Sequence, residues 1–238
     1  MLIRSEKNLG IAAALNRLIR WGERKGYKWM ISLDQDSVCP TDYVKDMLPL
    51  LDLKRVGIAA PVIIDRSIGV VGHSPKGSYA EVRTCITSGA FNSIAAWCKV
   101  GGYDESMFID SVDFEYCYRL RKHGYRVVQS GKVWLLHEVG KSQKRRFLIW
   151  KVTVNRHSAF RKYYIARNNI YYPLKHRLWL HLARGNMRNL WLIIAVLLYE
   201  NNKSEKLKEI LRGWKDGIKG SAGKLFPNLT ELRQRPKI

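Results

Sequence analysis

The alternation of strand-like and helix-like segments over residues 1–138 constrains the fold more than any other feature of this chain. Short apolar runs typical of β-strands fall at residues 27–33, 56–64, 81–86, 125–128 and 133–136. Segments with apolar residues at helical spacing lie among them, at residues 8–25, 41–51, 94–100 and 114–123. Strands that alternate with helices predict a layered α/β domain with a largely parallel sheet.

Charge divides the chain into two parts. Residues 1–138 hold 19 basic and 15 acidic side chains, whereas residues 139–238 hold 23 and 5. No Asp or Glu occurs between Val139 and Tyr199. We therefore predict a catalytic domain over residues 1–140 and a basic, mostly helical region over residues 141–238. The polar stretch at residues 141–146 is suited to a connection between them.

Composition narrows the class of protein further. The formal net charge of +22 points to an anionic partner, which could be nucleic acid, an acidic membrane face or a phosphorylated substrate. The four cysteines lie far apart with no CxxC pair, so they predict reduced thiols and neither a zinc site nor a disulfide framework. The opening residues lack the apolar core of a signal peptide.

The most apolar run, residues 190–199, is too short to cross a bilayer. Ten helical residues span about 15 Å, roughly half of the hydrocarbon core. The surrounding segment, residues 174–199, predicts a helix with tryptophans and interspersed arginines. Such a helix can lie in a membrane interface or pack its apolar face on the catalytic domain.

Two acidic groups stand at places where chemistry is expected. Asp34 and Asp36 directly follow an apolar strand, and ligands of open α/β sheets bind beyond the carboxyl ends of the strands. Paired carboxylates there suit Mg²⁺ or Mn²⁺, although a solvated turn would have the same composition. His137 also follows a strand, so it could reach the same sheet edge and serve as a metal ligand, or be merely structural.

A second acidic cluster spans residues 110–115 and opens a helix. Acids in a first turn favour the helix dipole, which is the structural interpretation; a general base near the metal is the functional one. Arg119 lies four residues beyond Glu115 and is expected to pair with it. The basic aromatic stretch at residues 161–169 suits either phosphate or nucleic acid.

The order of these motifs resembles glycosyltransferase family 2. Five segments carry the resemblance in order: NLGIAAALN at 8–16, LDQDS at 33–37, SGAFNSIAAWCKVGGYDE at 88–105, FIDSVDFEYCYRLRKHGY at 108–125 and LLHEVG at 135–140. Two later segments resemble the rhamnosyltransferase branch: RKYYIARNNIYY at 161–172 and WKDGIKGSAGK at 214–224.

The resemblance implies a GT-A fold, a Rossmann-like α/β sheet for nucleotide-diphosphate sugars, with specific roles for the matching residues. Asp113 would be the catalytic base, although Val112 stands where many members have an acid. Asp36 and His137 would hold Mg²⁺ or Mn²⁺. The remaining expected roles are donor binding by Asp34, Asp36, Gly89, Ala90, Arg161 and Arg167, and contact with the acceptor by Trp97, Asp110 and Tyr103. Ordinary core packing is the favoured alternative for the two aromatic residues.

The implied activity is an inverting transfer of a sugar, rhamnose from dTDP-rhamnose by branch resemblance, to a glycan or lipid-linked glycan. This chemistry belongs to cell-surface polysaccharide synthesis, including cell wall and O-antigen. The family's opening strands, which hold the nucleotide base, have no counterpart here, so we expect an N-terminally incomplete sheet and weak or absent activity. The alternatives are a non-catalytic remnant of the fold and a nucleic-acid-binding module, the latter supported by charge alone.

Location follows from the basic region. Polybasic segments are attracted to the anionic cytoplasmic leaflet by roughly 1 kcal/mol per Lys or Arg near the surface. Many enzymes of the family that this chain resembles use lipid-linked acceptors, which would lie in the same membrane. We therefore expect a cytoplasmic protein bound peripherally to the inner face of the cell membrane.

Overall fold

The computed structural model describes residues 3–66, 68–137, 142–147, 150–155 and 157–221, with residues 142–147, 150–155 and 221 described by backbone alone. The last three residues of the 214–224 motif, and Lys141 of the expected connection, lie outside this part. The chain forms two compact units. The α/β unit comprises residues 13–104 and 112–139; the helical unit comprises residues 1–12, 105–111 and 140–238.

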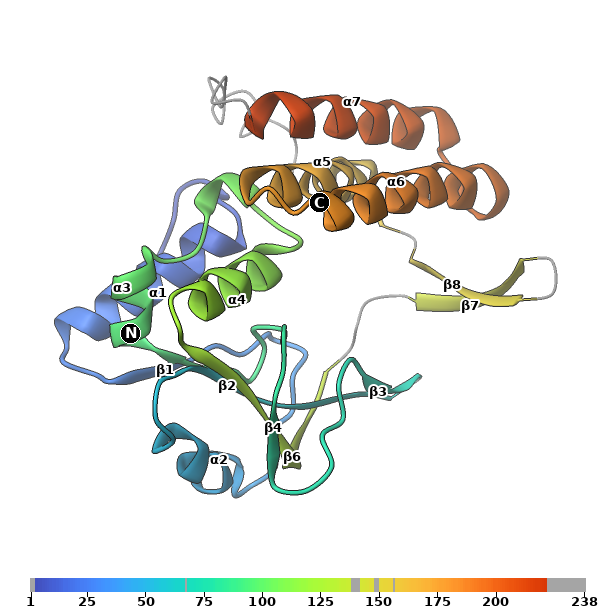
Figure 1. The fold of residues 1–238 in the computed structure, drawn as a ribbon. Coiled ribbons are helices and arrows are strands. Elements are labelled where there is room, and N and C mark those ends of the chain that lie inside the picture. Colours follow the sequence, from blue (N-terminus) through green and yellow to red (C-terminus); the bar gives the residue numbers. More distant parts are fainter. Residues whose placement is uncertain (1–2, 67, 138–141, 148–149, 156, 222–238) are drawn as a thin grey trace. The chain divides into compact units, whose positions relative to one another are not determined.

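A six-stranded sheet forms the centre of the α/β unit (Figure 1). Its strands in spatial order are β1 (Trp29–Ile31), β5 (Phe91–Ser93), β2 (Val56–Asp65), β6 (Arg126–Leu136) and β4 (Tyr79–Glu81), and β3 (Gly69–Val71) pairs with β2. The α/β class is therefore confirmed. The two apolar runs expected at 125–128 and 133–136 are one continuous strand.

The expectation of a largely parallel sheet is wrong, because only β2 and β6 pair in parallel among the described strands. The short strand β5 lies between β1 and β2 and runs antiparallel to both. It returns to the sheet through a loop, and a parallel neighbour would need a crossover connection, usually a helix. A strand over 81–86 is also wrong: β4 ends at Glu81, and Cys85 leaves the sheet to pack on Cys117.

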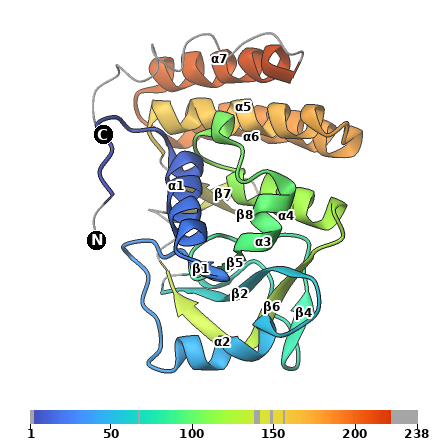
Figure 2. The same cartoon turned by 90° about the vertical axis from the view of Figure 1, so that its left-hand side faces the viewer.

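Four helices cover the two faces of this sheet (Figures 1 and 2). They are α1 (Ile11–Arg24), α2 (Tyr43–Leu51), α3 (Ile94–Val100) and α4 (Val112–Lys122), each within a few residues of its expected place. The helix α2 covers one face, and α1, α3 and α4 cover the other. A single 3₁₀ turn, η1 (Glu105–Met107), precedes α4.

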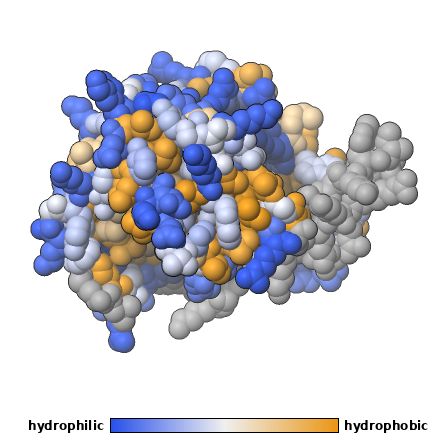
Figure 3. Space-filling model, turned by 90° about the horizontal axis from the view of Figure 1, so that it is seen from below, coloured by the Kyte–Doolittle hydropathy of each residue, from blue (hydrophilic) through white to orange (hydrophobic). Residues whose placement is uncertain are grey.

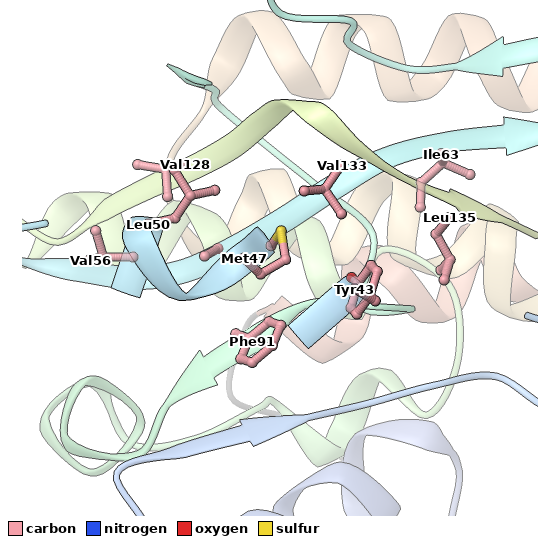
Figure 4. Close-up of a cluster of buried hydrophobic side chains, with 10 residues drawn as sticks. Tyr43, Met47, Leu50, Val56, Ile63, Phe91, Val128, Val133 and Leu135 are labelled. Atoms are coloured by element: carbon pink, nitrogen blue, oxygen red, sulfur yellow. The ribbon is translucent and has the colours of Figure 1, made fainter. Parts of the chain in front are cut away.

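The hydrophobic core beneath α2 shows how this helix packs on the sheet. Tyr43, Met47 and Leu50 recur at helical spacing and point into a cluster with residues of β2, β5 and β6 (Figure 4). The outward face of α2 carries exposed Val44 and Leu48, and the surface seen from this side mixes hydrophobic and hydrophilic patches (Figure 3).

In the helical unit, α5 (Ala159–Lys175) packs against both α6 (Trp179–Tyr199) and α7 (Lys203–Ser221). The unit also contains an antiparallel hairpin of β7 (Ser142–Phe147) and β8 (Trp150–Asn155). Ser158 caps α5 by accepting a hydrogen bond from the Arg161 amide. A buried ion cluster joins the helices: Glu200 Oε1 lies 2.5 Å from Lys162 Nζ, and Glu200 Oε2 lies 2.8 Å from Lys206 Nζ.

Two expectations for this region are corrected. The helix predicted over 174–199 is broken, because Arg177 has a left-handed φ of 56° that ends α5 before α6 begins. The described part of the expected connection at 141–146 is strand β7, which pairs with β8. Among the described residues, no helix is long and apolar enough to cross a membrane.

Candidate metal centre and active site

The loop after β1, residues 33–37, brings Asp34 and Asp36 to the sheet edge where β6 ends. Val38 and Leu136 exchange backbone hydrogen bonds of 2.8 and 3.2 Å, which ties this acidic loop to the end of β6. The His137 amide donates to the Ile64 carbonyl at 3.0 Å. These backbone contacts fix where His137 lies relative to the acidic loop.

Asp34, Asp36 and His137 lie together as the sequence analysis expects. His137 Nδ1 lies 3.1 Å from Asp36 Oδ1, and Nε2 lies 3.8 Å from Asp34 Oδ2. Each of the three residues offers one atom that could bind a metal ion, and these three atoms all lie within 4.8 Å of one another. The imidazole is largely buried, whereas both carboxylates are partly open to solvent.

This donor set fits a divalent cation. Carboxylate oxygens are the ligands that Mg²⁺ and Mn²⁺ prefer, and a neutral imidazole is a common additional ligand. Two protein carboxylates leave coordination positions for water and substrate phosphates, which is the usual arrangement for Mg²⁺. The three residues therefore could hold a divalent metal ion at an accessible position.

Electrostatics at the cluster also favour a cation. Burial raises the pKa of the Asp34 carboxyl above its ordinary value; the nearby Asp36 carboxylate raises it further, and His137 opposes the rise. Both effects that raise the pKa disfavour the charged form of Asp34. A bound cation would offset the repulsion between the two carboxylates.

Ser37 and Ser88 hold the acidic loop, and sequence reasoning missed both as site residues. Ser88 is 1% exposed, and its Oγ lies 2.6 Å from Ser37 Oγ and accepts a 3.2 Å hydrogen bond from the Asp34 amide. Ser37 Oγ also lies 3.1 Å from His137 Nδ1. A signal was present, since Ser37 ends the 33–37 motif and Ser88 begins the 88–105 motif, but their contacts span more than fifty residues of sequence.

Gly89 and Ala90, which are expected to bind the donor, lie beside Ser32, the residue that follows β1. The Gly89 amide donates to the Ser32 carbonyl at 2.7 Å, and the Gly89 carbonyl accepts from the Tyr43 hydroxyl. Gly89 has a φ of 73°, and a Cβ there would lie 2.7 Å from the Tyr43 hydroxyl, so a side chain would not fit. Both residues are buried, and their contact with a donor stays a prediction.

Asp113 is the second residue of α4 and is half-buried. Its neighbour Glu115 is fully buried and paired with Arg119, whose Nε lies 2.8 Å from Glu115 Oε1, which confirms the expected pair. Arg119 also donates to the Val100 and Gly102 carbonyls. The first turn of α4 is therefore anchored inside the α/β unit, and the role of Asp113 as a base stays a prediction.

Trp97 and Tyr103 are 7% and 3% exposed, as their core alternative predicts. The Trp97 indole donates to Asn16 Oδ1 at 3.0 Å, and the Tyr103 hydroxyl donates to Asn92 Oδ1 at 2.7 Å. Burial raises the pKa of the Tyr103 hydroxyl well above its ordinary value. Contact of either residue with an acceptor stays a prediction.

Asp110, Arg161 and Arg167 belong to the helical unit. Arg161 Nη2 lies 3.0 Å from Asp110 Oδ1, so the two side chains form an ion pair. Arg167 is fully buried; its Nη2 donates to the Ser106 and Met107 carbonyls, and its guanidinium lies 4.6 Å from the Tyr164 ring centroid. Contact of these residues with the donor or acceptor stays a prediction.

Comparison with known proteins identifies the family. The model of glycosyl transferase family 2 matches residues 1–99. The chain is 31% identical over 233 residues to the dTDP-rhamnosyl transferase RfbF of Shigella flexneri, an alignment that covers 91% of this chain and 78% of that protein.

Two solved structures also align with the chain. They are the S. aureus TarS 1–349 structure, with a TM-score of 0.47, and a GalNAc-T7 structure with UDP, GalNAc and Mn²⁺, with a TM-score of 0.49. Each is 13% identical; the alignments cover 95% and 93% of this chain but only 58% and 45% of those chains.

The fold and the site are those of an α/β enzyme with an acidic, metal-compatible centre at a sheet edge. The chain belongs to glycosyl transferase family 2 and is a glycosyltransferase.

Proposed function

We propose that this glycosyltransferase moves rhamnose from dTDP-rhamnose, with inversion, to a glycan or lipid-linked glycan in cell-surface polysaccharide synthesis. The observation that carries the proposal is the meeting of Asp34, Asp36 and His137 at one sheet edge. The choice of donor rests on similarity to a dTDP-rhamnosyl transferase over most of both chains.

The cluster is the proposed binding site for Mg²⁺ or Mn²⁺, and such a cation would supply charge neutralisation for the donor's diphosphate. Asp36 and His137 are the proposed ligands, with Asp34 beside them and directed toward the donor. Gly89, Ala90, Arg161 and Arg167 are the other proposed donor contacts. Guanidinium groups suit the phosphates of a sugar nucleotide because they offer two parallel N–H groups and a permanent positive charge.

Asp113 is the proposed general base. As a carboxylate it takes the proton from the attacking acceptor hydroxyl, whose oxygen forms a bond to the anomeric carbon. The bond from that carbon to the diphosphate oxygen breaks, and dTDP leaves with the electron pair. Attack from the face opposite the nucleotide inverts the anomeric centre without a covalent enzyme intermediate. Trp97, Asp110 and Tyr103 are the proposed residues on the acceptor side.

Neutralising Asp36 is expected to weaken metal binding by more than about tenfold. Loss of an outer-sphere partner already costs about 10–100-fold in metal affinity, and Asp36 is a proposed direct ligand. Mn²⁺ titration by electron paramagnetic resonance, on wild-type protein and Asp36→Asn, measures this. Asp42→Asn removes an exposed carboxylate outside the cluster and is the matched control, which should bind as wild type. Equal Mn²⁺ affinity in all three proteins would refute the metal centre.

The exposed side of α6 supports the proposed peripheral attachment to the inner face of the membrane. Its exposed apolar residues follow helical spacing: Leu180, Met187, Leu190, Ile194, Leu197 and Leu198. Arg184 and Arg188 are exposed on the same helix, and Arg177 is exposed just before it. An apolar stripe beside basic residues is the pattern of a helix lying in an anionic membrane surface.

Vesicle sedimentation tests this attachment. The wild-type protein should sediment with vesicles containing phosphatidylglycerol at low salt, and salt or neutral lipid should weaken binding. The double variant Met187→Glu/Leu190→Glu should lose most of the bound fraction, because it adds negative charge to the apolar stripe. Val44→Glu/Leu48→Glu changes two exposed apolar residues on α2 and should leave binding unchanged. Failure of the wild type to sediment would overturn the membrane proposal.

A further inference from the structure

The turn that precedes β5 is fixed to Ser32, the residue that follows β1. The Ser32 hydroxyl donates to the Thr87 carbonyl at 2.7 Å, and the Ser32 amide donates to the Ala90 carbonyl at 3.3 Å. The Gly89 amide donates back to the Ser32 carbonyl at 2.7 Å. All of these residues belong to the α/β unit. The backbone of Ser88, which lies inside this turn, is therefore held on both sides by the end of β1.

The Ser88 side chain connects two members of the proposed metal site. Its Oγ accepts a 3.2 Å hydrogen bond from the Asp34 amide and lies 2.6 Å from Ser37 Oγ. Ser37 Oγ in turn lies 3.1 Å from His137 Nδ1. Because Ser88 is only 1% exposed, bulk water does not compete for these contacts. One buried hydroxyl thus reaches the backbone of Asp34 directly and the imidazole of His137 through a second hydroxyl.

The contacts of the His137 ring indicate which of its nitrogens is available to a metal ion. Besides Ser37 Oγ, Nδ1 has Asp36 Oδ1 as a neighbour at 3.1 Å. An ionised carboxylate only accepts hydrogen bonds, so the hydrogen of the neutral ring belongs on Nδ1. The other nitrogen, Nε2, is then the atom that can bind a cation. It lies 3.8 Å from Asp34 Oδ2.

We propose that Ser88 is a positioning residue for the metal ion, because it fixes the spacing between Asp34 and Nε2 of His137. Metal-binding histidines depend on such outer partners, and loss of one typically costs about 10–100-fold in metal affinity. A serine is uncharged, and Ser88 is not itself a proposed ligand, so it would act through geometry alone. The inference rests on the proposed function, since it assumes a divalent cation at this cluster.

The test uses Ser88→Ala in the full chain. This substitution removes the hydroxyl, adds no atoms and leaves every proposed ligand in place. Mn²⁺ titration by electron paramagnetic resonance should show an affinity about 10–100-fold below that of the wild type. Electron spin-echo modulation, recorded with each protein saturated with Mn²⁺, detects nitrogen bound directly to the metal. The imidazole signal should be weaker in Ser88→Ala, because the ring is no longer held in place.

The matched control is Ser93→Ala, in the same unit. Ser93 is 9% exposed, and its Oγ accepts a 3.3 Å hydrogen bond from the Ala96 amide at the start of α3. Its substitution also removes a buried hydroxyl that holds one backbone amide, but this hydroxyl has no contact with the acidic loop among those described. Its Mn²⁺ affinity and imidazole signal should equal those of the wild type.

Substitutions of Ser37 test whether the two hydroxyls act in series. Ser37→Ala should weaken the imidazole signal, whereas Ser37→Thr keeps the hydroxyl and should retain it. The double variant Ser37→Ala/Ser88→Ala should lose less affinity than the product of the two single losses, because both changes break the same path to His137. If Ser88→Ala does not fold by circular dichroism, the Ser37 pair tests the path from a less buried position.

The outcomes separate this inference from the metal centre itself. Wild-type Mn²⁺ affinity in folded Ser88→Ala, an equal loss in Ser93→Ala, or losses that simply multiply in the double variant would overturn the role of Ser88. An unchanged imidazole signal in both Ser88→Ala and Ser37→Ala would do the same. Absence of Mn²⁺ binding in the wild type would instead refute the proposed metal centre.

Discussion

Asp113→Asn is expected to lower the turnover number by about 10²–10⁴-fold, the usual contribution of a general base. The amide keeps the shape of the carboxylate but cannot accept the proton of the attacking hydroxyl. Nucleotide and metal binding should change little, because the lost interaction belongs to the transition state. The measurement is the rate of dTDP release from dTDP-rhamnose, with water or extracted lipid-linked glycan as the acceptor.

The control for this variant is Asp46→Asn. Asp46 is an exposed carboxylate in the first turn of α2, so its neutralisation removes a comparable helix-dipole interaction, worth about 0.3–1 kcal/mol, without touching the proposed base. It should turn over at the wild-type rate. Undiminished turnover in Asp113→Asn would show that another group takes the proton.

The largest expected effect on stability comes from Glu200→Gln. Glu200 is 3% exposed and lies between Lys162 and Lys206, and Lys162 is itself 2% exposed. Removing one partner of a buried ion pair leaves an uncompensated charge and costs about 3–5 kcal/mol. Burial already lowers the pKa of Lys162, and Glu200 opposes that change by favouring the charged ammonium. Urea unfolding at pH 7 measures the loss.

One further variant is the control for this prediction, and the pH dependence of Glu200→Gln tests its cause. Glu205→Gln, at an exposed position in the first turn of α7, should cost no more than about 1 kcal/mol. In Glu200→Gln the pKa of Lys162 should fall further, so the difference from wild type should shrink as the pH rises and Lys162 becomes neutral. A loss below about 1 kcal/mol at pH 7 would show that the ion cluster is not a structural centre of the helices.

Much of the α/β unit could be predicted because its long elements have clear periodicity. The helices α1, α2, α3 and α4 lie close to their expected places. The meeting of Asp34, Asp36 and His137 could also be anticipated, since Asp36 and His137 each follow a strand and strand ends meet at one sheet edge. The meeting of residues about one hundred positions apart thus followed from topology.

What could not be predicted depends on contacts that leave no local pattern. The three-residue strand β5 has too few residues to show a period, yet it makes the sheet mostly antiparallel. Asn168 is a polar residue in a basic stretch, and only the fold shows that its amide is buried and donates to the carbonyls of residues 107, 109 and 110. Arg177 breaks a helical pattern through its own backbone conformation, which composition does not reveal.

Calorimetric titration with dTDP-rhamnose, with and without Mn²⁺, tests the central claim most directly. The account predicts binding that depends on Mn²⁺ and is lost in Asp36→Asn but retained in Asp113→Asn. This pattern would assign the diphosphate to the Asp34, Asp36 and His137 cluster and the chemistry to a separate residue. Donor binding that is the same without metal, or unchanged in Asp36→Asn, would contradict a metal-dependent donor site at this sheet edge.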